Sequence, residues 1–401
     1  MRIDNIEVFN LRYEVPLDAG FSYGGGRLTA RVTSIVKVTA TNGMVGWGAA
    51  YSHPSLVRVI IESHLKPFLV GEDPIQTEAL WNRMYRLTRW YGRKGVAMSA
   101  LGALDIAFWD LKGKAAGAPV YELLGGSKRR VPAYASALLW HESLDRLADE
   151  AASYIEQGFR RVKMRLGRNE DYDVAAVRAV RRAIGDHGLI VDASMRYDLE
   201  TAVRIGHVLE ELKVFWYEEP FEPEDIDNYI ALRKEVRIPV AAGENDFGVQ
   251  GFREMLRAGA LDIVQPDACR AGGISEVYAV GEMAQTFGAR VGTHTWSDAV
   301  ALVANMHVVA ALPNGISVEM DRTGNPFIDD LLVEPLRIAD GHLTLSGAPG
   351  LGIEVDEKTL ARLMMPAEQP VPDGAYSDMS FGKAYDFVMP PYRLQGGRHD
   401  Q

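Results

Sequence analysis

Cysteine is nearly absent from this sequence, since Cys269 is the single one among 401 residues. One cysteine excludes an internal disulfide, and the composition is compatible with a reducing compartment. A lone cysteine is more often a small buried hydrophobic residue than a catalytic thiol, so we expect Cys269 to lie in a core.

Cationic residues are also scarce, because 43 Lys and Arg stand against 54 Asp and Glu, for a net charge of −11. An acidic chain without a run of basic residues has no electrostatic footprint for nucleic acid, and none is expected as a partner. An anionic substrate would have to be held by local cations or by a metal ion, since the overall charge repels it.

Long apolar runs are missing as well. No stretch approaches the ~18 residues of a membrane span, and the opening MRIDNIEVF lacks the basic-then-apolar layout of a signal peptide. We therefore expect a cytoplasmic protein without a membrane partner. The hydrophobic fraction of 47% and the charged fraction of 24% indicate a folded globular chain, with two or three structural units at this length.

The first unit, residues 1–126, begins with strand-like alternation and continues with helical spacing. Asn42-Gly43 marks a tight hairpin turn between two of its strands. From about Pro54 the apolar spacing becomes helical, and Gly117 is a plausible helix stop. These features predict an N-terminal α+β domain.

The second unit, residues 127–321, repeats a short apolar strand followed by an amphipathic stretch. Eight such strands are expected, and their starts lie 23 to 30 residues apart, at 131, 161, 189, 214, 238, 261, 289 and 316. This rhythm predicts an α/β fold with a (β/α)8 barrel of the TIM type. A doubly wound open sheet is the alternative, but it rarely needs eight units and no G-x-G-x-x-G follows the first strand. Residues 322–401, rich in Pro and Gly, should return to complete the first domain.

Carboxylates stand at the ends of three successive barrel strands. Asp192, Glu218 and Glu244 are each 26 residues apart, one repeat, so they should converge on one point at the carboxyl end of the barrel. Unpaired, they would repel one another, and all-oxygen ligation suits one Mg²⁺ per chain. The alternative is that each carboxylate caps the following helix.

Two further pairs stand at strand ends. Asp267 and His294 follow neighbouring strands, so an Asp–His pair that tunes a general base is feasible. Lys163 and Arg165 are separated by one residue and therefore share one face of their strand. They either face the carboxylates and a substrate anion or form an ion pair within the barrel wall.

Several phrases in this order resemble the mandelate racemase and muconate-lactonizing family of the enolase superfamily, in its mandelate racemase-like branch, over nearly the whole chain. They are SALGALDIAFWDLKGKAAGAPVYELLGG (99–126), Lys-x-Arg (163–165), VDAS (191–194), YEEP (217–220), GEN (243–245) and QPDACRAGG (265–273).

The resemblance implies a role for each matching residue. Asp192, Glu218 and Glu244 match the metal ligands, Asp267 and His294 match the His–Asp dyad, and Glu319 matches the acidic group that hydrogen-bonds the substrate carboxylate. Glu219 is expected to support the ligands. The first domain is expected to cap the barrel, with the loop Phe21–Arg27 and the stretch Trp90–Arg93 closing over the site.

Three positions depart from the family pattern: Ser194 where many relatives have Asn, Ala49 where many have Glu, and Arg165 where the usual Lys-x-Lys places a second base. Arginine, with a pKa above about 12, stays protonated, so racemisation with a base on each face is disfavoured.

A single competent base suits removal of the proton α to a carboxylate followed by loss of water, so we expect an acid-sugar dehydratase, a lyase. The alternatives are a cycloisomerase of a sugar lactone, which EMDRTGNPFIDDLL (319–332) also resembles, then a racemase or epimerase, and last a non-catalytic metal-binding barrel. The expected partner is a small hydroxy-carboxylate substrate, and a homo-oligomer is expected.

Overall fold

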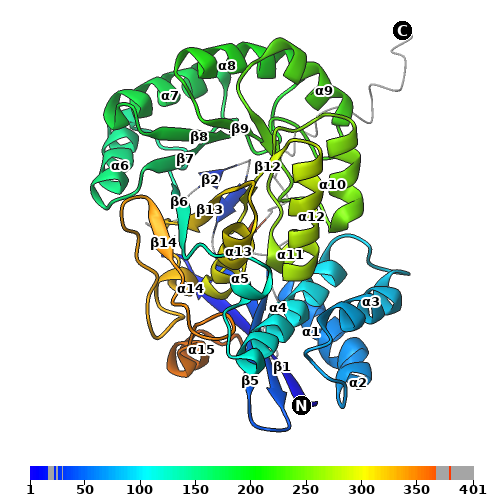
Figure 1. Ribbon diagram of the computed structural model, residues 1–401. Coiled ribbons are helices and arrows are strands. Elements are labelled where there is room, and N and C mark those ends of the chain that lie inside the picture. Colours follow the sequence, from blue (N-terminus) through cyan, green and yellow to red (C-terminus); the bar gives the residue numbers. More distant parts are fainter. Residues whose placement is uncertain (17–21, 24–25, 29, 367–378, 381–401) are drawn as a thin grey trace.

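The computed structural model describes residues 1–16, 22–23, 26–28, 30–366 and 379–380. Figure 1 shows a barrel of strands inside a ring of helices, with the N-terminal segment forming a separate layer at one side. The expected α/β barrel with an N-terminal α+β unit is confirmed. The doubly wound open sheet is excluded, since the last barrel strand pairs with the first.

The N-terminal sheet is antiparallel in the order β1 (Ile3–Glu14), β4 (Ala30–Ala40), β5 (Val45–Ala50). The Asn42-Gly43 turn joins β4 to β5 as expected, and Gly43 has a φ of 80°, which an L side chain rarely adopts. Short strands β2 (Ser22–Tyr23) and β3 (Gly26–Leu28) pair with each other, and β15 (Met379–Ser380) pairs with β3.

One face of this sheet packs on helix α4 (Val96–Ala116), which is buried along nearly its whole length. Gly46 and Gly48 of β5 allow the close approach, because a Cβ on them would lie only 2.3 Å and 1.9 Å from carbonyl oxygens of α4. The helix ends at Gly117, whose φ of 67° is left-handed, as the sequence predicts. The neighbouring helices are α1 (Pro54–Arg58), η1 (Val59–Leu65), α2 (Lys66–Leu69), α3 (Thr77–Thr88) and α5 (Val120–Leu123).

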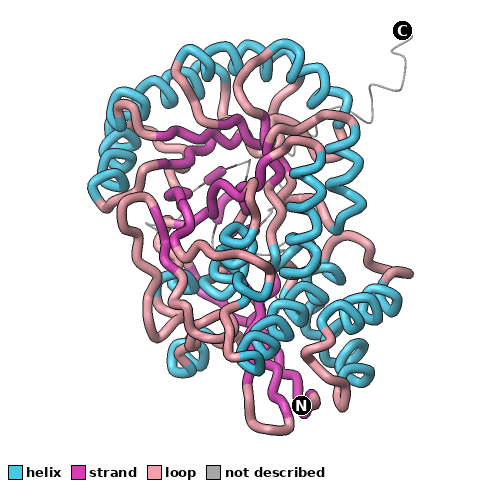
Figure 2. Tube along the Cα trace, in the orientation of Figure 1, coloured by secondary structure: helices cyan, strands magenta, loops and turns pink. Residues whose placement is uncertain are grey.

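All eight expected barrel strands are present, and each pairs in parallel with the next along the chain. Pairing of β13 with β6 closes the barrel, and Figure 2 shows the strands inside the ring of helices. The strands are β6 (Arg130–Ser136), β7 (Arg161–Arg165), β8 (Gly188–Asp192), β9 (Trp216–Glu218), β10 (Val240–Ala242), β11 (Ile263–Val264), β12 (Arg290–Thr293) and β13 (Gly315–Asp321).

The helices between the strands bury one apolar face against the barrel, and several begin at a capping Ser, Asn or Asp side chain. Helix α13 differs, because it is buried on all sides between the barrel and the first unit. These helices are α6 (Leu144–Glu156), α7 (Glu170–Ile184), α8 (Leu199–Glu211), α9 (Ile226–Glu235), α10 (Gly248–Arg257), α11 (Ala268–Ala271), α12 (Ile274–Thr286) and α13 (Ala299–Ala311).

The segment after the barrel returns to the N-terminal sheet, as expected. It contains α14 (Pro326–Asp329), β14 (His342–Thr344), which pairs with β6, and α15 (Glu357–Leu363), which packs against β1. The Met365 N–H donates to the Asn10 carbonyl of β1 at 2.8 Å. The segment up to Met365 therefore packs against the N-terminal sheet.

The N-terminal unit contacts the carboxyl ends of the barrel strands. Arg31 of β4 pairs with Asp321 at the end of β13 (2.9 Å), and both side chains are buried. Thr33 donates to the Asp298 carboxylate at the start of α13 (2.6 Å), and the Tyr51 N–H donates to the Cys269 carbonyl (3.1 Å). The sheet is thus fixed over the barrel end where such folds assemble their sites.

Among the described helices, none combines the length and the apolar character that a bilayer span requires.

His307 on α13 gives the first testable prediction. Burial lowers its pKa to about 4 from the ordinary 6.5, and its ring accepts the Tyr121 N–H and donates to the Leu351 carbonyl. Between pH 6.5 and pH 4 the unfolded chain binds a proton at His307 that the folded protein does not bind. Protonation therefore favours the unfolded state in this range. We expect up to about 3 kcal/mol of unfolding free energy to be lost as pH falls from 6.5 toward 4.

Urea unfolding of wild type and His307→Gln at pH 7 and pH 4.5 measures this contribution. The variant should lose less stability between the two pH values than wild type. His207→Gln, whose side chain is 53% exposed, is the matched control. Equal acid sensitivity of wild type and His307→Gln would contradict the prediction.

Candidate active site

The carboxylates of Asp192, Glu218 and Glu244 lie at the ends of three adjacent strands. Asp192 closes β8, Glu218 closes β9, and the two are paired in register. Glu244 follows β10 by two residues. Because parallel strands place their carboxyl ends at the same rim, residues one repeat apart come together.

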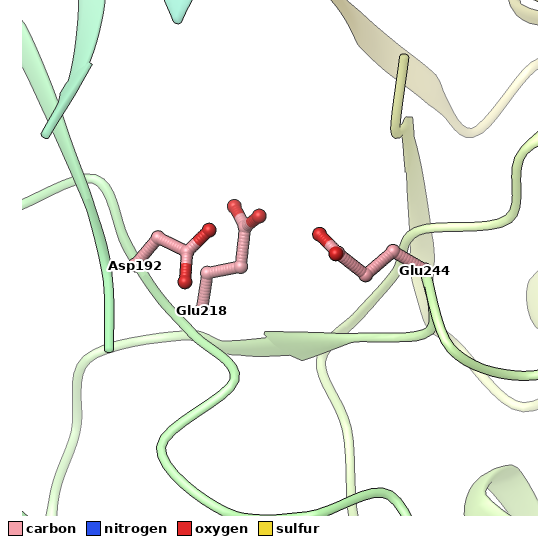
Figure 3. A group of neighbouring side chains, drawn as sticks. All are labelled: Asp192, Glu218 and Glu244. Atoms are coloured by element: carbon pink, nitrogen blue, oxygen red, sulfur yellow. The ribbon is translucent and has the colours of Figure 1, made fainter. Parts of the chain in front are cut away.

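The three side chains point into one space, as Figure 3 shows. One ligand oxygen from each lies within 4.8 Å of the others, and Asp192 and Glu218 are buried. The Glu244 Oε2 atom is buried without a hydrogen-bond partner among the described residues. Oxygen donors at this separation, one of them unsatisfied, fit a hard divalent cation.

The helix-capping alternative is wrong for all three carboxylates. The N-cap residues of helices α8, α9 and α10 are Asp198, Asp225 and Phe247 instead. Asp267 does cap a helix, because its carboxylate accepts the Cys269 N–H at the start of α11.

Lys163 of β7 is completely buried and reaches the carboxylates. Its Nζ lies 2.6 Å from Glu218 Oε1, 2.6 Å from Glu319 Oε1 and 3.5 Å from Asp192 Oδ2. Burial by itself lowers the pKa of this ammonium, but Glu218 and Glu319 outweigh burial and raise the pKa above its usual value. Lys163 is therefore a fixed cation at the barrel mouth.

Arg165, two residues further along β7, shares the inward face with Lys163. Its guanidinium bonds the Asp192 carboxylate, and its Cζ lies 5.0 Å from the centre of the Trp296 ring. Arg31 of the N-terminal sheet lies over the same ring at 5.2 Å. Both cations of the Lys-x-Arg motif thus face the carboxylates and form ion pairs with them. This is one of the two arrangements that the sequence left open.

The predicted Asp–His pair is formed. His294 Nδ1 lies 2.8 Å from Asp267 Oδ2, and His294 Nε2 faces Glu244 Oε2 at 3.5 Å and Glu319 Oε2 at 3.9 Å. Burial alone lowers the His294 pKa, but Glu244, Glu319 and Asp267 together raise it above the usual value. The ring therefore has one nitrogen bound to a carboxylate and the other directed toward the site.

Glu319 of β13 links the two halves of the site. It forms an ion pair with Lys163 and also accepts a hydrogen bond from the Thr295 N–H at 3.1 Å. Burial would raise its pKa, but Lys163 and His294 dominate and lower the pKa to about 2. In this charge state Glu319 accepts hydrogen bonds and does not donate them.

Glu219 lies beside the three carboxylates without joining them. Its carboxylate accepts from Asn245 Nδ2 at 3.2 Å and 3.1 Å. Burial and the nearby charges of Glu244 and Glu218 raise its pKa well above the usual range. This position agrees with the supporting place expected from the sequence.

The sequence did not single out several residues that contact the candidate site. Trp216 Nε1 donates to Glu218 Oε2 at 2.9 Å, Asn305 Nδ2 donates to Asp267 Oδ1 at 2.9 Å, and the Trp296 ring contacts both Arg31 and Arg165. An asparagine in the apolar stretch AVALVANMHVVAA was the available signal for Asn305.

Closure of the two expected segments over the barrel stays a prediction. The loop Phe21–Arg27 lies partly outside the described residues. In the second segment, Trp90 is 81% exposed. Arg93, with Lys94, lines a cavity of about 260 Å³ beside α10.

Cys269 is buried as expected, and burial raises its thiol pKa well above the usual value.

Two positions that depart from the family pattern have ordinary surroundings. Ser194 adopts a left-handed φ of 50°, a conformation that asparagine also tolerates, and donates its N–H to Asp192 Oδ1. Ala49 is buried in β5.

Comparison with known proteins adds independent findings. Residues 6–125 match the family described as mandelate racemase / muconate lactonizing enzyme, N-terminal domain, and residues 146–359 match the family described as enolase C-terminal domain-like.

Individual relatives cover most of the chain. A D-galactarolactone cycloisomerase of Agrobacterium fabrum is 36% identical over 87% of this chain and 96% of its own length. An arabinonate dehydratase of Saccharolobus solfataricus is 36% identical over 88% and 96%. The crystal structure of a racemase from Streptomyces coelicolor A3(2) with bound magnesium superposes with a TM-score of 0.84 at 28% identity, over 90% of this chain and all of that one.

The buried position of Lys163 gives a second testable prediction. Replacing it in Lys163→Met leaves carboxylates buried without their cation, and removing one partner of a buried pair costs about 3–5 kcal/mol. The free energy of unfolding, measured by urea titration in EDTA, should fall by that amount. An added divalent cation should restore part of the loss.

Lys37→Met is the control, because the partner of Lys37, Glu357, is 68% exposed and such surface pairs contribute about 1 kcal/mol or less. Equal losses for the two variants would show that Lys163 is not needed to compensate the buried carboxylates.

Proposed function

Because this chain belongs to the mandelate racemase and muconate lactonizing enzyme family of the enolase superfamily, we propose that it is an acid-sugar dehydratase. It removes the proton α to the carboxylate of a small sugar acid and expels the hydroxyl on the neighbouring carbon as water. The observation that carries the proposal is the His294–Asp267 pair, whose free ring nitrogen faces the convergent carboxylates.

The proposed cofactor is one Mg²⁺ per chain, held by Asp192, Glu218 and Glu244. The separation of their oxygens and the unsatisfied Glu244 Oε2 support this, as does the magnesium in the related racemase structure. When bound, the ion stabilises the negative charge that develops on the substrate carboxylate after proton loss. Trp216 supports the site by orienting Glu218.

His294 is the proposed general base. Asp267 accepts the Nδ1 proton, which leaves the lone pair of Nε2 for the α-proton of the substrate. The imidazolium that results then gives this proton from Nε2 to the departing hydroxyl, which leaves as water. His294 therefore makes both proton transfers of the reaction from one face of the substrate.

Lys163 and Glu319 are proposed to bind the substrate carboxylate. The Lys163 ammonium is buried and charged, so it can donate to the carboxylate oxygen that gains charge. Ionised Glu319 orients Lys163, and it would hydrogen-bond the substrate carboxylate only after taking up a proton. The arrival of a second negative charge favours that protonation.

Arg165 is proposed to be a permanent cation that holds Asp192 and the substrate anion. Freeing an arginine of its proton near neutral pH costs on the order of 7 kcal/mol, and its pairing with Asp192 makes this harder. A second base on the opposite face is therefore disfavoured, which argues against a racemase or epimerase.

Cycloisomerisation of a sugar lactone is the second candidate. It also needs a single base, and the similarity to the D-galactarolactone cycloisomerase favours it as specifically as the arabinonate dehydratase favours dehydration. Screening sugar acids and sugar lactones with Mg²⁺ separates the two by the mass of the product, because dehydration removes one water from a sugar acid and cycloisomerisation opens a lactone without a change of mass. A non-catalytic barrel would turn over neither class and would exchange no α-proton.

The metal assignment predicts that Glu218→Gln binds Mg²⁺ at least 10-fold more weakly than wild type by isothermal titration calorimetry, since it loses a charged ligand beside two others. Activity should disappear on chelation and return with Mg²⁺. Glu235→Gln, on the exposed surface of α9, is the control and should bind normally. Full activity of metal-free protein would refute the assignment.

His294 is the proposed base and Arg165 a permanent cation, so their replacement should affect α-proton exchange differently. His294→Asn should abolish both turnover and deuterium incorporation into recovered substrate, a loss of about 10²–10⁴-fold or more. Arg165→Met should weaken binding or slow turnover and still allow exchange at the face served by His294.

Deuterium incorporation in heavy water, measured by mass spectrometry, checks both variants, with His207→Asn as the surface control. The opposite pattern, exchange in His294→Asn and none in Arg165→Met, would reverse the assignment and remove the argument against racemisation.

A further inference from the structure

Helix α13 carries an amide in a place where apolar side chains are expected. Asn305 is completely buried, and its neighbours along the helix are Ala, Val, Leu and Met apart from His307. A buried amide costs free energy unless its donors and acceptor are all used. The contacts of Asn305 therefore indicate why this side chain is present.

The Asn305 amide connects the two residues of the Asp–His pair. Its Oδ1 accepts the Ala268 N–H at 3.0 Å, and its Nδ2 donates to Asp267 Oδ1 at 2.9 Å. The same Nδ2 contacts the His294 carbonyl at 3.0 Å and Thr295 Oγ1 at 2.9 Å. A backbone N–H can only donate, so it fixes which end of the amide faces Asp267.

The two carboxylate oxygens of Asp267 have different hydrogen-bond partners. Oδ1 accepts from Asn305 Nδ2, from the Cys269 N–H at 3.1 Å and from Cys269 Sγ at 3.1 Å. Oδ2 is left for His294 Nδ1 at 2.8 Å. A carboxylate bound in this way cannot rotate without breaking several hydrogen bonds at once.

From this geometry we propose that Asn305 is a positioning residue of the reaction. It holds the Asp267 carboxylate and the His294 backbone in the arrangement that directs His294 Nε2 at the substrate. The proposal rests on the function assigned above, since it concerns the same base. Groups that orient metal-ligating side chains typically contribute 10- to 100-fold to activity, and we expect an effect of the same order for a group that orients the His294 base.

Asn305→Leu tests the proposal, because leucine keeps the volume and removes the hydrogen bonds. We expect kcat to fall about 10- to 100-fold, while KM and the Mg²⁺ dissociation constant stay within about 2-fold, since the hydrogen bonds of the amide among the described residues reach none of Asp192, Glu218, Glu244 and Lys163. If Asn305 acts through Asp267, the substitution should add little in an Asp267→Asn background.

A substrate-free readout separates this inference from the proposed function. The proton on His294 Nδ1, bonded to Asp267, should give an NMR signal that is absent from His294→Asn. That signal should weaken or disappear in Asn305→Leu. If wild type turns over no sugar acid or lactone, the proposed function fails, and the signal alone still decides the role of Asn305.

Asn314→Leu is the matched control, because Asn314 lies just beyond the C-terminal end of α13 and its Nδ2 donates to the Gly281 and Ala289 carbonyls and not to the Asp–His pair. It should keep kcat and the His294 signal. If Asn305→Leu does not fold, Asn305→Ser, which keeps one donor, is measured in the same way and should show a smaller loss. An unchanged signal and kcat in the Asn305 variant would overturn the proposal. So would a double variant with Asp267→Asn in which the two single-variant losses of kcat multiply.

Discussion

Negative charge is buried at the carboxyl end of the barrel, and much of the surrounding structure compensates it. Asp192, Glu218, Glu244 and Glu319 come from four strands and would repel one another strongly away from water. Lys163 is hydrogen-bonded within this group, and Arg165 holds Asp192 from the same strand. The protein thus supplies part of the counter-charge, and in the proposed function a divalent ion would supply the rest.

The same charges create the conditions for a base. His294 lies at the edge of the carboxylate group, so its proton affinity depends on the charges that it faces, while Asp267 fixes its orientation from behind. Arg165 has no such freedom, because guanidinium stays charged. In the proposed mechanism the two faces of the substrate would therefore meet chemically different residues, which suits elimination from one face better than exchange between two faces.

The N-terminal sheet takes part in this arrangement through strand β4. Arg31 pairs with Asp321 and lies over Trp296, whose ring also contacts Arg165, and Thr33 holds Asp298 at the start of α13. Helix α13 in turn carries Asn305. Buried contacts thus connect strand β4 to Arg165 through Trp296 and, through the start of helix α13, to the element that carries Asn305.

The sequence was enough to predict the eight-strand rhythm, the hairpin at Asn42-Gly43, the helix end at Gly117 and the convergence of Asp192, Glu218 and Glu244, because each follows from local periodicity or from one residue per repeat. It also paired Asp267 with His294. It left open whether Lys163 and Arg165 face the site or the barrel wall, and it did not reveal Trp216, Trp296 or Asn305. Those contacts depend on side chains that meet across strands and between the two units. Only tertiary packing decided them, since hydrogen-bond partners 38 residues apart, such as Asn305 and Asp267, share no local pattern.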